Sequence, residues 1–119
     1  MIFYQRNLDM RTRTVYAIQH NKTGRIYIGS SERVKWRIVE HLQLLRNHKC
    51  KNPLMQADFD KFGEDYTFRK LDVITKDTET WKEYYWMLYF QTINEEFGYN
   101  YRDTHITRRK FEEFEPVKV

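Results

Sequence analysis

The sequence predicts an α+β domain in which a small three-stranded antiparallel sheet is flanked by three or more helices, in the order ββααβα. Three observations lead to this fold class: two short alternating segments joined by a turn-forming stretch, stretches with apolar residues at helical spacing, and a third strand-like segment before an aromatic-rich helix. The 119 residues suffice for one hydrophobic core and are too few for two.

The first two strands are predicted to form a hairpin. Residues 14–18 and 25–30 alternate in polarity and are rich in β-branched residues, and each contains one tyrosine, Tyr16 or Tyr27. The stretch between them, 21–24, ends in Gly24, which favours a tight connection. The pattern therefore places two tyrosines on neighbouring strands.

Two helices are expected next. Ser30 or Ser31 can cap a helix over residues 32–47, which has an apolar stripe at helical spacing (Val34, Ile38, Leu42 and Leu45). Asn52 followed by Pro53 is typical of a helix start, and the short helix over 54–62 should end at Gly63.

The third strand is predicted at residues 66–74, followed by a helix capped by Asp77 or Thr78 and reaching about residue 94. This helix is apolar on two opposite faces, so we expect it to be buried or sandwiched. Glu83 falls on one of these faces, ahead of Trp86. Burial of a carboxylate requires compensation, so Glu83 is either a rim residue paired with a lysine or a metal ligand.

Both ends of the chain differ from the middle. Residues 1–13 are polar and basic, and form either a leader or an arm that touches a partner, whereas 101–119 is a charged C-terminal extension. The basic cluster Arg108, Arg109 and Lys110 is either a solvated face or a set of DNA phosphate contacts. The predicted domain is therefore 14–100.

Composition narrows the class of protein. There are 21 Lys and Arg residues against 17 Asp and Glu, a net charge of +4 that is compatible with a polyanionic partner. One cysteine, Cys50, cannot form an intrachain disulfide, and no apolar run is long enough for a signal peptide or a membrane span. We therefore expect a cytoplasmic protein without a membrane partner.

Arg37 and His41 lie four residues apart on the first predicted helix, so they project from one face. That face borders the apolar stripe, at the place where the helix meets the sheet. Arg37 alone is typical of a charged surface residue, and His41 alone is typical of a histidine at the edge of the core. Together with Tyr16 and Tyr27 on the adjoining hairpin, they form a set suited to phosphodiester chemistry.

These residues belong to an ordered series that resembles the GIY-YIG nuclease family over about residues 14–100. The second family motif is intact, and the first keeps its tyrosine but has Thr14 in place of glycine. A further histidine found in some members has no clear counterpart near His48 or Cys50. The matching segments are Thr14-Val15-Tyr16, Tyr27-Ile28-Gly29-Ser30, Trp36-Arg37, His41, Lys61-Phe62-Gly63, Glu83 and Gly98-Tyr99-Asn100.

The resemblance implies a DNA endonuclease, similar to the catalytic domain of a homing endonuclease, that uses one divalent ion, Mg²⁺ or Mn²⁺, held by Glu83. Arg37 would stabilise the transition state. Tyr16 would help to deprotonate water, with His41 either accepting the proton or holding Tyr16 by a hydrogen bond, and Tyr27 would orient the water. Gly29, Ser30 and Asn100 would bind or position substrate.

An alternative function is a catalytically silent module that binds DNA or a protein through a nuclease-like fold. The predicted elements leave no space for an added DNA-binding domain, so a homodimer or a partner protein could supply target specificity. Such a compact nuclease suits a phage or another mobile element. Cleavage of one strand or of both is compatible with the sequence.

Overall fold

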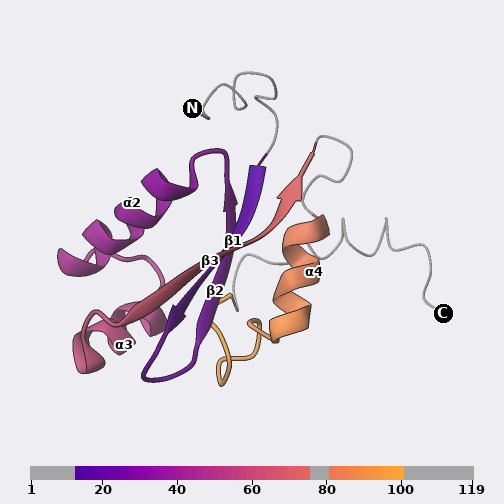
Figure 1. Ribbon diagram of the computed structural model, residues 1–119. Coiled ribbons are helices and arrows are strands. Elements are labelled where there is room, and N and C mark those ends of the chain that lie inside the picture. Colours follow the sequence, from indigo (N-terminus) through magenta and orange to yellow (C-terminus); the bar gives the residue numbers. More distant parts are fainter. Residues whose placement is uncertain (1–12, 76–80, 101–119) are drawn as a thin grey trace.

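The structure is a computed structural model, and it describes residues 13–75 and 81–100. Its sheet has the order β2-β1-β3, with both neighbouring pairs antiparallel. The elements follow the predicted order ββααβα (Figure 1): β1 Arg13–His20, β2 Ile26–Ser31, α2 Val34–Arg46, α3 Pro53–Phe62, β3 Tyr66–Ile74 and α4 Trp81–Phe90. The predicted fold class is thereby confirmed.

The sheet separates two helical layers, because the side chains of a strand alternate between its faces. Val15 and Ala17 of β1 pack with residues of α4, whereas Tyr16 and Ile18 pack toward α2 and α3. Figure 1 shows α2 and α3 on one side of the strands and α4 on the other. The single central strand thus contributes to two hydrophobic clusters.

The hairpin has the predicted form. Tyr16 lies opposite Gly29, and Ile18 lies opposite Tyr27. Gly24 has a φ of 78°, a left-handed conformation that favours glycine, and its N–H donates to the carbonyl of His20. β1 begins at Arg13, so this residue belongs to the sheet and not to the polar leader expected over 1–13.

The two helix starts differ from one another. Asn52 caps α3 as predicted, since its side chain accepts a hydrogen bond from the N–H of Met55. α2 begins at Val34, two residues later than expected, and Arg33 stands at its cap without a side-chain capping bond. The Ser31 hydroxyl instead accepts from the N–H of Arg33, so the prediction of a serine cap was wrong.

β3 has an irregularity beside Tyr16. Val15 pairs with Asp72 and Tyr16 pairs with Lys70, so Leu71 is the extra residue of a β-bulge. Bulges increase local twist and are frequent near active sites because they change the direction of a side chain.

α4 ends at Phe90, four residues before the predicted end, and Gln91 takes a φ of 57°. The predicted caps Asp77 and Thr78 lie outside the described residues. Tyr84 and Met87 are buried against the sheet, but Tyr85, Leu88 and Tyr89 are exposed. The expectation that both apolar faces are covered is therefore not met within the described part of the chain.

The segment after α4 lies along the outer edge of β2. The N–H of Ile26 donates to the carbonyl of Phe97, and the N–H of Tyr99 donates to the carbonyl of Ile26. Arg25 and Tyr99 both bind the buried carboxylate of Asp58 on α3, at 2.9 and 2.6 Å. These bonds connect β2, α3 and residues 97–100.

No helix in residues 13–75 and 81–100 has the length and the apolar character needed to cross a membrane.

Candidate active site

Three of the predicted site residues meet on the sheet face covered by α2. The Tyr16 hydroxyl lies 3.0 Å from His41 Nε2. The ring centroids of Tyr27 and His41 are 5.0 Å apart, and those of Tyr16 and Tyr27 are 6.3 Å apart. His41 therefore contacts both hairpin tyrosines from α2.

Gly29 leaves space for this cluster. A Cβ atom at this position would lie 2.7 Å from the Tyr16 hydroxyl oxygen and 2.9 Å from Tyr27 Cε2, both closer than real Cβ contacts allow. The glycine of the Tyr-Ile-Gly motif is therefore required for steric reasons, because the two tyrosine side chains lie directly against it.

Burial controls the protonation of the Tyr16–His41 pair. Desolvation raises the pKa of Tyr16 well above its usual range, reinforced by Tyr27 and Glu83 and opposed by Arg37. Desolvation, together with the positive charge of Arg37, lowers the pKa of His41 to about 4. At neutral pH both side chains are uncharged, so Tyr16 can donate its proton to an unprotonated His41 nitrogen.

Arg37 lies one helical turn before His41 and is half-exposed. Its Nη1 donates to Oε1 of Glu40 at 2.7 Å, an ion pair between exposed partners three residues apart. Hydrogen bonding to Glu40 raises the pKa of Arg37 further, so the guanidinium stays charged. A planar, permanently charged fork at this place suits phosphate oxygens.

Glu83 belongs to the other half of the site, on the sheet face covered by α4. Ser30 Oγ donates to Glu83 Oε1 at 2.8 Å, and Arg13 donates to both the hydroxyl and the carbonyl of Ser30. Desolvation raises the pKa of Glu83, while the Ser30 bond and the charge of Arg13 oppose that rise.

Asp72 fixes the helix that bears Glu83. Its two carboxylate oxygens accept from Lys82 Nζ at 3.1 Å and from Trp86 Nε1 at 3.0 Å. Asp72 follows the bulge residue of β3, so the irregular strand and α4 are held together at this point. Glu83, beside Lys82, is thereby directed toward Ser30 on β2.

The two halves of the site meet around the end of β2. Tyr27 and Gly29 contact the Tyr16–His41 side, whereas Ser30 contacts Glu83. The charge of Glu83 is close enough to raise the pKa of Tyr16. The site therefore combines a neutral proton-transfer pair, a cation and a carboxylate at one edge of the sheet.

The residues present fit a single hard divalent ion. Glu83 offers a partly buried carboxylate whose ionised form is disfavoured by desolvation, and a bound cation would offset that cost. Among the described residues, no group of three or more His, Cys, Asp and Glu side chains could hold a metal. The protein would supply one carboxylate, leaving the other positions to water and phosphate.

Asn100 supports β2. Its Oδ1 accepts from the N–H of Ile28 at 2.7 Å, and its Nδ2 donates to the carbonyl of Ile28 at 2.9 Å. The side-chain oxygen and nitrogen of Asn100 are thus both bonded to Ile28, the residue between Tyr27 and Gly29. Asn100 holds the motif backbone in place from the far end of the chain.

Three contacts of charged residues around the site are not predicted by the sequence. They are Arg13 with Ser30, Glu40 with Arg37, and Asp72 with Lys82 and Trp86. The spacing of Arg37 and Glu40 was a sufficient signal for their contact. The predicted phosphate contacts Arg108, Arg109 and Lys110 lie outside the described residues.

The fold and this site together define the catalytic domain of a nuclease. The family profile described as the GIY-YIG catalytic domain matches residues 13–100. The chain belongs to this family, and it is a GIY-YIG-type endonuclease whose substrate is DNA.

Solved structures agree with the fold. A mutant of the catalytic domain of the intron endonuclease I-TevI is 22% identical, with a TM-score of 0.69, covering 77% of this chain and 95% of that one. The catalytic domain of the homing endonuclease I-TevI is 24% identical, with a TM-score of 0.67, covering 76% of this chain and 99% of that one. No curated protein sequence matches the chain significantly.

Proposed function

We propose that this chain hydrolyses DNA phosphodiester bonds in a reaction that requires one divalent ion, Mg²⁺ or Mn²⁺, at Glu83. The main support is the position of the partly buried Glu83 carboxylate. It is bonded to Ser30 at the end of β2, and the Tyr16–His41 pair lies on the other side of that strand end. When bound, the ion supplies charge stabilisation at the phosphate and at the leaving 3′-oxygen.

Tyr16 and His41 act as a proton relay in this proposal. A neutral tyrosine is a poor base, and burial makes its phenolate still less accessible. The Tyr16 oxygen takes a proton from the attacking water while its own hydroxyl proton passes to His41 Nε2. The water oxygen then bonds to phosphorus, the bond to the 3′-oxygen breaks, and that oxygen takes a proton from solvent.

Arg37 links substrate binding to the relay. Its positive charge stabilises the pentacoordinate phosphate and also lowers the pKa of His41. A DNA phosphate paired with Arg37 offsets that charge, so His41 becomes a better proton acceptor once substrate is bound. The relay is thus strengthened when the phosphate is in place.

Nicking of supercoiled plasmid tests this function. We expect cleavage with Mg²⁺, no cleavage with a chelator, and no cleavage by Glu83→Ala, with DNA binding retained. Glu64→Ala is the matched control, because Glu64 is an exposed carboxylate paired with Arg46 on the protein surface. Wild-type cleavage rates in Glu83→Ala would refute the metal assignment, and a wild-type chain that binds DNA without cutting would support the silent module.

A further inference from the structure

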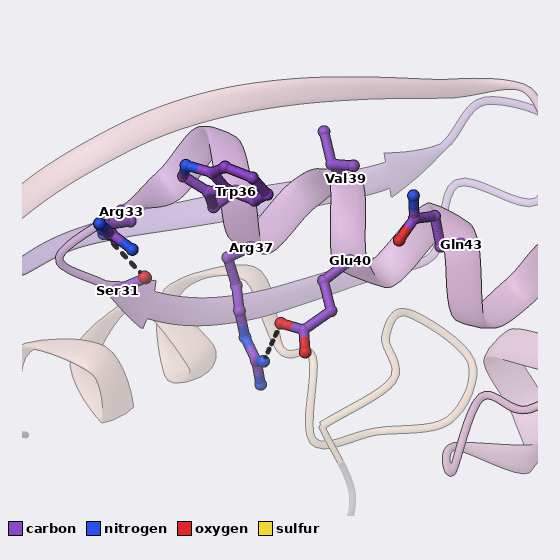
Figure 2. A pocket seen from close by; sticks show the side chains of 7 residues that line it. All are labelled: Ser31, Arg33, Trp36, Arg37, Val39, Glu40 and Gln43. Carbon is purple, nitrogen blue, oxygen red and sulfur yellow. Dashed lines mark hydrogen bonds and ion pairs between the residues drawn. The ribbon is translucent and has the colours of Figure 1, made fainter.

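A hollow of about 400 Å³ lies along the outer side of α2, next to the candidate active site. Figure 2 shows Ser31 and Arg33 before the start of α2 and the other lining side chains on α2 itself, with Arg37 joined to Glu40 by their ion pair. Arg37 therefore lines the hollow as well as being near the Tyr16–His41 pair. The hollow therefore shares Arg37 with the site that we assign to the scissile phosphate.

The most unusual residue of the hollow is Trp36. Its side chain is 68% exposed, although tryptophan is largely buried on average. Val39, 44% exposed, lies in the same hollow. A large aromatic surface held in water by a rigid helix, beside a substrate site, is suited to stacking on a flat ligand.

Charge and hydrogen-bonding groups around Trp36 indicate what that ligand is. Arg33 and Arg37 line the hollow at one helical turn from each other, and Gln43 adds an amide. Two guanidinium groups suit phosphate, whereas an indole suits a base. Glu40 is the opposing charge, but an exposed ion pair contributes little stability, so a phosphate can replace it on Arg37.

We propose that this hollow binds an unstacked nucleotide of the DNA strand adjacent to the scissile phosphate, with its base on Trp36 and its phosphate at Arg33 and Arg37. The proposal rests on the function given above, and it adds a preference for locally opened or single-stranded DNA. Duplex DNA presents its bases stacked inside the helix, so it uses the arginines without using the indole.

Fluorescence anisotropy in the presence of a chelator tests the proposal apart from cleavage. The probes are a labelled short oligo-dT strand and a labelled duplex of equal length. The variants are Trp36→Ala, Trp36→Phe, which keeps an aromatic face, and the control Tyr89→Ala. Tyr89 is 64% exposed on α4, across the sheet from α2. Circular dichroism verifies that each variant is folded.

We expect Trp36→Ala to weaken binding of the single strand by about 5- to 150-fold, the effect of losing one aromatic stacking partner. Binding of the duplex should change much less. Trp36→Phe should recover most of the affinity, and Tyr89→Ala should match the wild type. Unchanged single-strand affinity in Trp36→Ala, or equal losses for Tyr89→Ala or for the duplex probe, would overturn the proposal.

The outcomes for the hollow and for the proposed function are separate. If the wild-type chain binds the single strand through Trp36 but leaves plasmid uncut with Mg²⁺, the cleavage function is wrong and the nucleotide site stands. If plasmid is cut while Trp36→Ala binds the single strand normally, the nucleotide site alone is wrong.

Discussion

His41 shows how burial sets the chemistry of a single residue in this enzyme. An exposed histidine would be partly charged near neutral pH, but desolvation and Arg37 lower the pKa of His41 to about 4. The neutral ring can then accept a hydrogen bond from Tyr16 throughout the physiological range. Protonation would replace that acceptor with a donor, so the hydrogen bond to Tyr16 would have to reverse its direction.

The same shift predicts a pH dependence of stability. Between pH 6.5 and about pH 4 the unfolded chain binds a proton at His41 and the folded chain does not, so folding stability falls as pH is lowered through that window. We expect His41→Asn to lose less stability than the wild type between pH 7 and pH 4, measured by thermal unfolding.

A substitution of an uncharged residue on the same helix provides the control for this measurement. Gln43 is exposed on α2 and its side chain does not titrate in this range, so Gln43→Asn should retain the wild-type pH profile. A His41→Asn profile that parallels the wild type would show that His41 does not titrate as its environment predicts.

At the scale of elements, the position of β2 depends on a residue far away in the sequence. Asn100 bonds both the N–H and the carbonyl of Ile28, in the manner of a neighbouring strand. Asn100→Ala leaves those buried backbone groups without these partners, which costs about 1–3 kcal/mol for a buried group left unpaired. The tyrosine and glycine on either side of Ile28 would then lose their fixed geometry.

We expect Asn100→Ala to lower the unfolding temperature, to accelerate hydrogen exchange at the Ile28 amide and to reduce cleavage. Asn94→Ala is a suitable control, because Asn94 makes an exposed bond to the N–H of Glu96 and does not involve β2. Slow exchange at Ile28 in Asn100→Ala would mean that other contacts suffice to hold the strand.

The elements themselves were largely predictable because their signals are local. Asn52 caps α3, Gly24 allows the hairpin turn, and residues 66–74 form β3 as expected. The predictions were wrong at the ends of two helices, the start of α2 and the end of α4. A serine that bonds a loop N–H cannot be told from one that caps a helix, and the end of α4 depends on the backbone of Gln91.

The site was less predictable than the elements. The family motif predicts Tyr16 and Glu83 as site residues, but their environments depend on contacts between distant segments. The Ser30–Glu83 bond spans 53 residues, and the Asn100–Ile28 bonds span 72. Spacing along one helix can predict pairs such as Arg37 and Glu40, but no local pattern places Asn100 on β2 or Arg13 on Ser30.

For the whole molecule, the ionised Glu83 carboxylate that the proposed function requires lowers the stability of the folded chain. Its pKa is raised in the folded state, so the folded chain binds more protons there than the unfolded chain. The contribution of Glu83 to folding stability is therefore fully present below the unfolded pKa of 4.5, and it decreases as pH rises toward the folded pKa. Above that window the ionised carboxylate remains a constant cost in the absence of a bound cation.

We expect Glu83→Gln to abolish cleavage and to raise the unfolding temperature at neutral pH in a chelator, with the gain disappearing near pH 4. Added Mg²⁺ should stabilise the wild type and leave Glu83→Gln unchanged, because only a folded site with a carboxylate binds the ion. Glu64→Gln serves as the control. A destabilised Glu83→Gln at neutral pH would contradict the assigned desolvation.

Residues 97–100 also determine how two molecules can approach each other. An uncovered strand edge is a template on which a strand of another molecule can pair. Ile26 and Ile28 already use their outward groups in bonds to this segment, so β2 has no free edge at these positions. A second copy of the chain therefore cannot extend the sheet by pairing with β2 at Ile26 and Ile28 while this segment keeps its bonds.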